Sequence, residues 1–238
     1  EKRWYDARGL GERVTWVGHL LVDDAARELS TPASAPREGR RRIVLMPGSR
    51  AGEIRKLLPL LRDAATLLTT RRNDVDVVLV RADSVPESLL GEVAGDALAG
   101  WTIVSGPHLA LLAASDVLVV ASGTATVEGL LAGIPMVVVY RVATISYLLG
   151  KLLVKVPNVA MANILSDPGD GSQTVPELIQ RAATPERIVA EVERFLSDPG
   201  HADEARRRLA LGREDLGPPG APGRTADAVL ALVGKGRA

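Results

Sequence analysis

Two short polar turns, each directly after an apolar run, contain the residues best suited to chemistry. The first is Met46-Pro47-Gly48-Ser49-Arg50, and the second is Ser122-Gly123-Thr124, followed by Ala125 and Glu128. Hydroxyls and the unpaired amides of a helix start suit a diphosphate, because the positive end of the helix dipole favours anions. The guanidinium of Arg50 can complement a phosphate, and Glu128 can accept both hydroxyls of a ribose. These residue types predict a nucleotide site.

Both turns also have a structural interpretation. The first could be an ordinary strand-to-helix connection with a solvated Arg50, and the second a capped helix with a favourable early Glu128. For the first turn alone the two interpretations are balanced. Because ligands of doubly wound sheets bind where parallel strands end, the presence of two such turns in one sheet favours binding.

Asn163 belongs to a third candidate group, Met161-Ala162-Asn163-Ile164-Leu165, which ends an extended stretch before the polar loop 167–172. Its structural role would be to cap a turn. Its functional role would be to contact a substrate, since loops on a rigid sheet often do so.

An apolar segment, Ile145 to Val156, is predicted to be a helix with Lys151 and Lys155 on it. We favour a core or interface helix whose lysine stems lie along apolar surface. The alternative is a helix that lies on anionic lipid headgroups.

Composition argues against several other classes of protein. The 29 basic and 29 acidic residues cancel, which disfavours nucleic-acid binding, and the absence of cysteine excludes disulfides and thiolate metal sites and fits a reducing cytosol. The three histidines lie far apart, and Asp74-Val75-Asp76 reads as a turn that leads into a strand, so we predict no metal and no cofactor. Neither a P-loop nor a dinucleotide fingerprint is present.

Apolar runs alternate with amphipathic helices through most of the chain, which predicts an α/β fold with a doubly wound parallel sheet. Residues 1–8 are predicted to be helical, Val14 to Val17 a short strand, and the polar stretch from Asp23 to Arg40 a connection. Beyond Val175 only helices are predicted, including one capped by Thr184 and a last one near Ala226 to Val233. The predicted strands are 43–46, 75–80, 102–104, 117–120 and 136–140, and the predicted helices between them lie near 53–70, 87–97 and 109.

Several motifs, in order and spacing, resemble one family. They are Leu45-Met-Pro-Gly-Ser-Arg50 with Glu53, Ala114-Ser-Asp116, Ala121-Ser-Gly-Thr-Ala-Thr-Val-Glu128, Ala132-Gly-Ile-Pro-Met136, Tyr140-Arg141 and Val175-Pro-Glu-Leu-Ile-Gln180. Together with Trp16-Val-Gly-His19 they are similar to the motifs of lipid-A-disaccharide synthase. Two departures are Met161-Ala-Asn-Ile-Leu-Ser-Asp167, where the family has Leu-Pro-Asn-Leu-Leu-Ala-Gly, and Leu20, where it has Pro.

The resemblance implies an inverting glycosyltransferase of the GT-B type, built of two Rossmann-like domains. Such an enzyme joins UDP-2,3-diacylglucosamine to 2,3-diacylglucosamine 1-phosphate, releasing UDP and forming the β(1→6) disaccharide of lipid A. Carried over by motif, Ser122, Gly123 and Thr124 would hold the diphosphate, and Glu128 would hold the ribose. Gly48, Ser49 and Ala125 would also bind the UDP-sugar. Arg50 would stabilise the leaving group, and Asn163 matches an asparagine of the donor-site loop, so these two are the catalytic candidates.

The same resemblance implies a domain organisation. Residues 1–38 would be the tail of an acceptor-binding domain and the crossover from it, 39–213 the donor-binding domain, and 214–238 a loop and a C-terminal helix. The chain begins at Glu1 and has no Met before Met46, so we expect a segment upstream that supplies the acceptor pocket and the general base. The chain alone is then expected to bind UDP without turnover.

The resemblance further implies a cytoplasmic protein, with peripheral contact to the inner membrane as the minor interpretation, and a homodimer that exchanges carboxyl domains. Two other functions stay open. One is a different UDP-sugar transferase or epimerase with the same donor domain, and the other is a non-catalytic nucleotide-binding module. The sugar-contacting residues and a donor panel would separate the two enzymes, and activity after restoring the upstream domain would separate both from the module.

Overall fold

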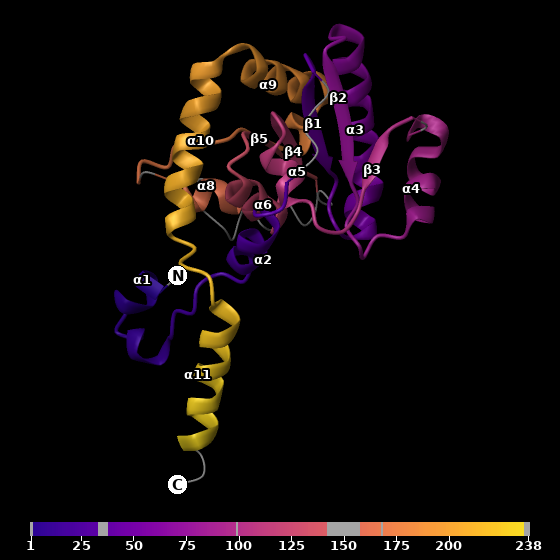
Figure 1. Cartoon of the computed structure of the whole chain (residues 1–238). Coiled ribbons are helices and arrows are strands. Elements are labelled where there is room, and N and C mark those ends of the chain that lie inside the picture. The colour runs from indigo at the N-terminus through magenta and orange to yellow at the C-terminus, as the bar shows by residue number, and fades with distance from the viewer. Residues whose placement is uncertain (1, 33–37, 99, 142–157, 168, 236–238) are drawn as a thin grey trace.

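A six-stranded parallel sheet forms the centre of the molecule, with the strand order β3-β2-β1-β4-β5-β6 (Figure 1). The structure is a computed structural model that describes residues 2–32, 38–98, 100–141, 158–167 and 169–235. This order is that of a doubly wound Rossmann sheet, so the predicted fold class is confirmed. The strands are β1 (Arg41–Met46), β2 (Val75–Val80), β3 (Thr102–Val104), β4 (Val117–Ala121), β5 (Met136–Tyr140) and β6 (Glu177–Ile179).

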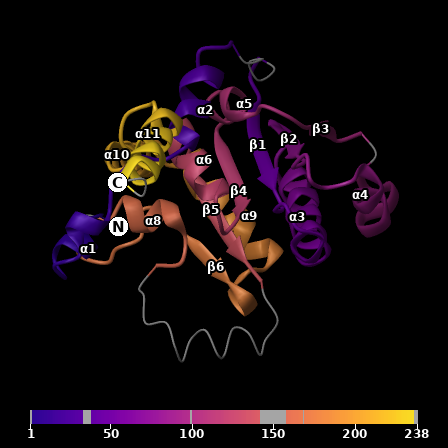
Figure 2. The same cartoon turned by 90° about the horizontal axis from the view of Figure 1, so that it is seen from below.

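Helices cover both faces of the sheet (Figure 2), and β1, β2, β4 and β5 contribute side chains to a buried cluster on each face. On β1, for example, Ile43 and Leu45 belong to one buried cluster, whereas Val44 and Met46 belong to the other. This alternation follows from the two-residue repeat of a strand. It explains why β4 and β5 are continuous apolar runs, as strands of a parallel sheet buried on both faces require.

The first cluster includes α3 (Ala51–Arg71), α4 (Glu87–Ala94) and α9 (Pro185–Ser197), and the second includes α2 (Leu21–Glu28), α5 (Leu109–Ala113), α6 (Ala125–Ala132), α8 (Met161–Leu165) and α10 (Pro199–Glu214). The remaining elements are α1 (Lys2–Asp6), α11 (Ala221–Lys235) and the 3-10 turns η1 (Gly11–Arg13), η2 (Gly95–Leu98) and η3 (Gln180–Ala182). Thr184 caps α9 as predicted, because its hydroxyl accepts the N–H of Arg187.

The stretch from Asp23 to Arg40 includes most of α2, and its role as a connection between domains stays a prediction. Three other local predictions are wrong. Val14 to Val17 is irregular chain and not a strand. The prediction of helices alone beyond Val175 missed β6, and Met161–Leu165 is a helix and not the end of an extended stretch. In each case contacts with distant parts of the chain decide the local structure.

Residues 16–19 pack against the loop before α11 and against its first turns, and α11 lies beyond one end of the sheet (Figure 1). The guanidinium of Arg224 donates to the carbonyl oxygen of Val17 at 2.9 Å, and the carboxylate of Asp23 accepts the amides of Gly220 and Ala221. The segments that precede and follow the predicted donor-binding domain therefore contact each other. The predicted domain boundaries stay a prediction.

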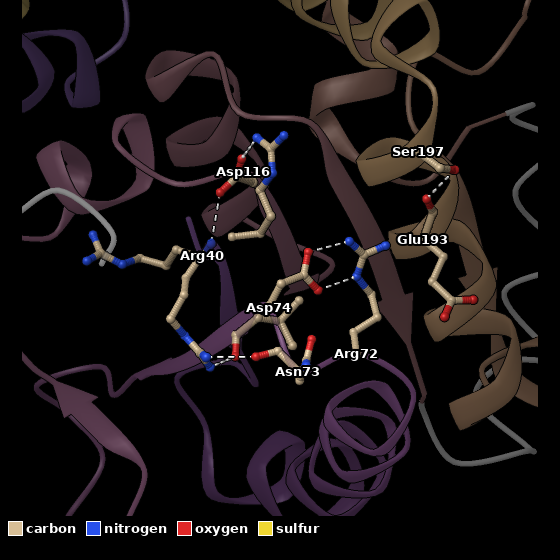
Figure 3. Close-up of polar contacts among 10 residues, drawn as sticks. Arg40, Arg72, Asn73, Asp74, Asp116, Glu193 and Ser197 are labelled. Carbon is tan, nitrogen blue, oxygen red and sulfur yellow. Dashed lines mark hydrogen bonds and ion pairs between the residues drawn. The ribbon is translucent and has the colours of Figure 1, made fainter. Parts of the chain in front are cut away.

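Ion pairs lie at the amino ends of β1, β2 and β4 (Figure 3). Arg40 pairs with Asp76 at 2.6 Å, Arg72 forms two hydrogen bonds with Asp74, and Arg41 pairs with Asp116 at 2.9 Å. The carboxylates of Asp74 and Asp76 are thus each paired with an arginine. This pairing agrees with the prediction of a turn and disfavours a metal-diphosphate motif.

Candidate nucleotide site

The two polar turns lie side by side at the carboxyl edge of the sheet. β1 and β4 are paired neighbours, with Met46 opposite Val120, so the turn after each strand begins at the same level. The chain order of the strands reverses between β1 and β4, and ligands of doubly wound folds bind at this point. A cavity of about 220 Å³ lies here. Its lining includes Gly48, Ser49, Arg50, Glu53, His108, Ser122, Gly123, Thr124, Ala125 and Glu128.

The turn between β4 and α6 offers hydrogen-bond donors to this cavity. The amide of Ser122 belongs to the sheet, where it donates to Val139, but the amides of Gly123, Thr124 and Ala125 have no acceptor in the part of the chain that the structure describes. Gly123 has a φ of +146°, a conformation that favours glycine. Three free amides at a helix start fit the oxygens of a diphosphate.

The turn between β1 and α3 is different, because Glu53 already occupies its amides. The Glu53 carboxylate accepts the N–H of Ser49 at 3.1 Å and that of Arg50 at 3.3 Å. Gly48, at a φ of +110°, passes so close that an added Cβ would collide with the Glu53 side chain. This turn is therefore rigid, and the amides of Ser49 and Arg50 already have an acceptor within the protein.

Arg50 supplies the cation of the site. One of its terminal nitrogens pairs with Glu53 at 3.1 Å, yet 82% of the side chain is exposed. Within the described residues, the other guanidinium nitrogens of Arg50 make no hydrogen bond. They remain available to an anion above the cavity, and the Glu53 contact limits the directions in which the side chain can point.

Glu128 reaches the cavity from the first turns of α6 and contacts a residue that our sequence analysis did not select. Its Oε2 lies 3.3 Å from Nε2 of His108, and Nδ1 of His108 lies 2.9 Å from the carbonyl oxygen of Gly106. Twenty residues separate the pair in sequence, so no local motif could have revealed it.

The pKa of His108 is raised above its ordinary value of 6.5. Burial acts to lower it, but the hydrogen bonds to Glu128 and Gly106 and the charges of Glu128 and Glu28 outweigh that effect. The imidazolium form thus persists to higher pH than in a free histidine. It places a positive charge beside the carboxylate of Glu128.

Asn163 lies outside this cavity, and the structure does not support a ligand contact. It is fully buried, and its amide nitrogen donates to the Val175 carbonyl and to Glu177. Its oxygen accepts the N–H groups of Thr174 and Val175, both at 2.9 Å. All of its hydrogen-bonding capacity is used, so its observed role is to anchor the amino end of β6 to α8. The proposed catalytic role of Asn163 is corrected accordingly.

Metal binding finds no support among the described residues, where no three or more histidine or acidic side chains are grouped suitably for an ion. The cavity instead presents amides, hydroxyls and a guanidinium. A larger hollow of about 520 Å³ beside Trp16 has a mainly apolar lining, to which Arg213 and Glu214 contribute the charged groups.

The segment from Ile145 to Val156 lies outside the described residues, so its predicted helix and the roles of Lys151 and Lys155 stay predictions. Within the described ranges, none of the helices reaches the combination of length and apolarity that a bilayer crossing demands.

Two solved structures illustrate the fold that this chain shares with other proteins. A spinosyn rhamnosyltransferase complexed with thymidine diphosphate superposes with a TM-score of 0.53 at 20% identity, over 82% of this chain and 48% of that one. A trehalose-6-phosphate synthase gives 0.50 at 12% identity, over 81% and 45%. At such low identities the similarity concerns the fold alone.

Sequence comparison is more specific. The model of the family described as "Lipid-A-disaccharide synthetase" matches residues 1–214. The lipid-A-disaccharide synthases of Geobacter sulfurreducens and Myxococcus xanthus are 35% and 37% identical to the chain, over 94% and 100% of it. The chain spans 59% and 61% of the lengths of these two relatives. It belongs to the lipid-A-disaccharide synthetase family.

Proposed function

We propose that the cavity at the ends of β1 and β4 binds the nucleotide of a UDP-sugar donor. The observation that carries this proposal is the set of three free amides at Gly123, Thr124 and Ala125 at the start of α6. They line one cavity with Arg50 and Glu128. Amides and a guanidinium match a diphosphate, and the carboxylate matches the two hydroxyls of a ribose.

The chemical task of such a site is to stabilise the charge that builds on the departing UDP when the anomeric carbon is attacked. Donors that are fixed before the reaction do this without reorganisation. The β4–α6 turn provides such donors, since its Ser122 amide is tied into the sheet. Arg50 adds a mobile but restrained positive charge, and the amides and the cation can act without a metal.

Family membership supports a proposal for the reaction of the complete protein. The donor is UDP-2,3-diacylglucosamine, the acceptor is 2,3-diacylglucosamine 1-phosphate, and the products are UDP and the β(1→6) disaccharide 1-phosphate. The acceptor pocket and the general base would come from a part of the relatives that this chain does not span. Cytoplasmic location, peripheral membrane contact at residues 145–156 and a homodimer belong to the same proposal.

Calorimetric titration of the chain with UDP tests the donor site, with UMP and ADP as comparators. UDP should bind more tightly than either, because UMP lacks the second phosphate and ADP carries the wrong base. Glu128→Ala should weaken UDP binding by about tenfold or more through the lost hydrogen bonds to the ribose. Glu92→Ala is the matched control, because Glu92 is an exposed carboxylate paired with Arg55 far from the cavity.

Equal affinity for UDP and ADP would contradict the uridine assignment, and unchanged UDP binding by Glu128→Ala would contradict the ribose assignment. The transfer reaction is tested separately by joining the chain to the amino-terminal part of a relative. Appearance of the disaccharide product supports the enzyme. A folded fusion that binds UDP but forms no product would favour a non-catalytic module.

A further inference from the structure

A chain of polar contacts joins the crossover segment to the nucleotide site. It begins at Glu28, the last residue of α2, whose Oε2 accepts the backbone N–H groups of His108 and Leu109, both at 3.0 Å. The series of contacts continues through the ring of His108 and ends at Glu128. Its first and last carboxylates are a hundred residues apart in sequence.

Glu28 fixes the backbone at His108. α5 begins directly after this histidine, and the His108 side chain forms no capping hydrogen bond of its own with the helix. The first amides of a helix need an outside acceptor, and here the carboxylate of α2 supplies it. The position of the imidazole therefore depends on α2, which lies in the segment predicted to connect two domains.

The hydrogen bonds of the ring define its protonation state. Nδ1 faces the carbonyl oxygen of Gly106 and Nε2 faces the carboxylate of Glu128, and both partners are acceptors. A neutral imidazole has only one N–H, so it can satisfy only one of them. The geometry is complete only when both nitrogens carry a proton.

Charged groups from several elements surround this ring. Glu128 approaches from α6 and Glu28 from α2, whereas Arg50 and Glu53, from the start of α3, line the same cavity. Asp83, in the loop after β2, accepts the N–H of Gly106 at 3.0 Å. Acidic groups outnumber Arg50, so the surroundings favour the imidazolium form.

We propose that Glu28 and His108 are positioning residues that hold the Glu128 carboxylate in the orientation needed to bind the ribose. The inference rests on the proposed function, which gives the ribose to Glu128. Oε2 of Glu128 is engaged by His108, and Oε1 has no hydrogen bond to any described residue, so it is available to a ligand in the cavity that Glu128 lines. The α2 helix thereby becomes a structural component of the donor site.

The test is UDP titration of the full chain between pH 6 and pH 9. Wild-type affinity should decrease as pH rises, because the neutral ring loses one of its two hydrogen bonds. His108→Gln should bind UDP about tenfold more weakly than wild type at pH 6, the order expected for a lost charge-assisted hydrogen bond. This variant should keep only the pH dependence that the terminal phosphate of UDP contributes, since its second ionisation lies near the lower end of the range. The difference between wild type and variant then reports the His108 ring.

Two substitutions at Glu28 separate charge from capping. Glu28→Gln keeps an oxygen for the amides of His108 and Leu109, so affinity at pH 6 should stay within about twofold of wild type. The missing charge should move the pH at which affinity falls to a lower value. Glu28→Ala removes the acceptor as well and should weaken binding at every pH. A purely structural role for Glu28 would not shift the pH profile in the Gln variant.

NMR titration of the His108 ring without nucleotide provides a second measurement. Its pKa should lie above the ordinary value in wild type and decrease in Glu28→Gln and Glu128→Ala. Unchanged UDP affinity and pH profile in a folded His108→Gln, with binding lost in Glu128→Ala, would overturn the positioning role and leave the proposed function intact. If wild type failed to bind UDP while the NMR shifts were as expected, the ribose assignment would be contradicted. Only the contacts among Glu28, His108 and Glu128 would then be supported.

Discussion

The two edges of the sheet use polar groups in opposite ways. At the amino edge, charged and amide groups are paired with each other, as in Arg41 with Asp116 and Arg72 with Asp74 (Figure 3). At the carboxyl edge, the amides of residues 123–125 and most of the Arg50 guanidinium have no partner among the described residues. Both edges consist of short turns after or before buried strands, so secondary structure alone does not account for the difference.

Paired polar groups stabilise a fold, and unpaired ones are available to a ligand. When one partner of a buried hydrogen-bonded pair is removed, the other partner has neither water nor a protein group to bond with. The stability lost in this way exceeds the net stability that the hydrogen bond contributed. The amino edge should therefore respond to mutation in stability, and the carboxyl edge in nucleotide affinity. Substitutions on both sides can test this division of roles.

The largest effect is expected at Asn163, which anchors the amino end of β6. Asn163→Ala would leave the N–H groups of Thr174 and Val175 and the Val175 carbonyl unpaired in the interior. We expect a loss of about 3 kcal/mol of unfolding free energy in urea denaturation. Asn73→Ala, at an exposed position near the amino end of β2, is the control and should change stability by less than about 0.5 kcal/mol.

UDP affinity separates this structural role from a catalytic one. Where Asn163→Ala remains folded, it should bind UDP like wild type. A variant of unchanged stability with strongly reduced UDP affinity would mean that Asn163 serves the ligand and that the comparison of the two edges is incorrect.

Asp116 is expected to give the next largest effect. Its carboxylate accepts the Arg42 amide at 2.8 Å and the Arg41 guanidinium at 2.9 Å. Asp116→Ala should lower the free energy of unfolding by about 2 kcal/mol, since the Arg42 amide and the Arg41 guanidinium both lose the hydrogen bond that this carboxylate accepts. Asp116→Asn keeps an oxygen for this amide and should lose about half as much. If both variants lost the same amount, the charge of Asp116 would matter more than its hydrogen bond to the backbone.

On the carboxyl edge, Arg50→Ala should weaken UDP binding about tenfold, or by about 1.4 kcal/mol, while stability hardly changes. Arg50→Lys should recover part of the loss, because an ammonium keeps the charge but not the fork of donors. Arg55→Ala on the same helix is the control, since Arg55 pairs with the exposed Glu92. Equal losses in the Arg50 and Arg55 variants would indicate a general effect of net charge and not a phosphate contact.

Much of the sheet could be predicted from the sequence because its central strands are apolar runs buried on both faces. β2, β3 and β5 agree residue for residue with the predicted strands 75–80, 102–104 and 136–140. β6 was missed because its three residues begin with Glu177, whose carboxylate is held by contacts from α8, so no apolar run marks the strand in the sequence. The apolar run at Val14 to Val17 misled because no strand of the described sheet pairs with it.

The site was predictable where its chemistry is local. Ser122-Gly123-Thr124 and Gly48-Ser49-Arg50 are continuous motifs at strand ends, and their meeting follows from the strand order. His108 and Glu28 were not predictable, since their roles depend on contacts across 20 and 80 residues. Asn163 shows the opposite error. Its residue type and its motif suit a ligand, but its side-chain amide is hydrogen-bonded to residues 11 to 14 positions later in the sequence.

The smallest effect is expected for Asp74, the most exposed carboxylate of the amino-edge pairs. Hydrogen bonding to Arg72 lowers the pKa of Asp74 below its ordinary value of 3.8, although partial burial opposes this shift. A carboxylate whose pKa is lower in the folded state stabilises the protein above its unfolded pKa, and this contribution disappears as pH falls through the folded pKa. Urea denaturation should therefore show wild type slightly more stable than Asp74→Asn at pH 6 and equal to it near pH 2. A stability difference that persists at the lower pH would show that the amino edge depends on the shape of this side chain and not on its charge.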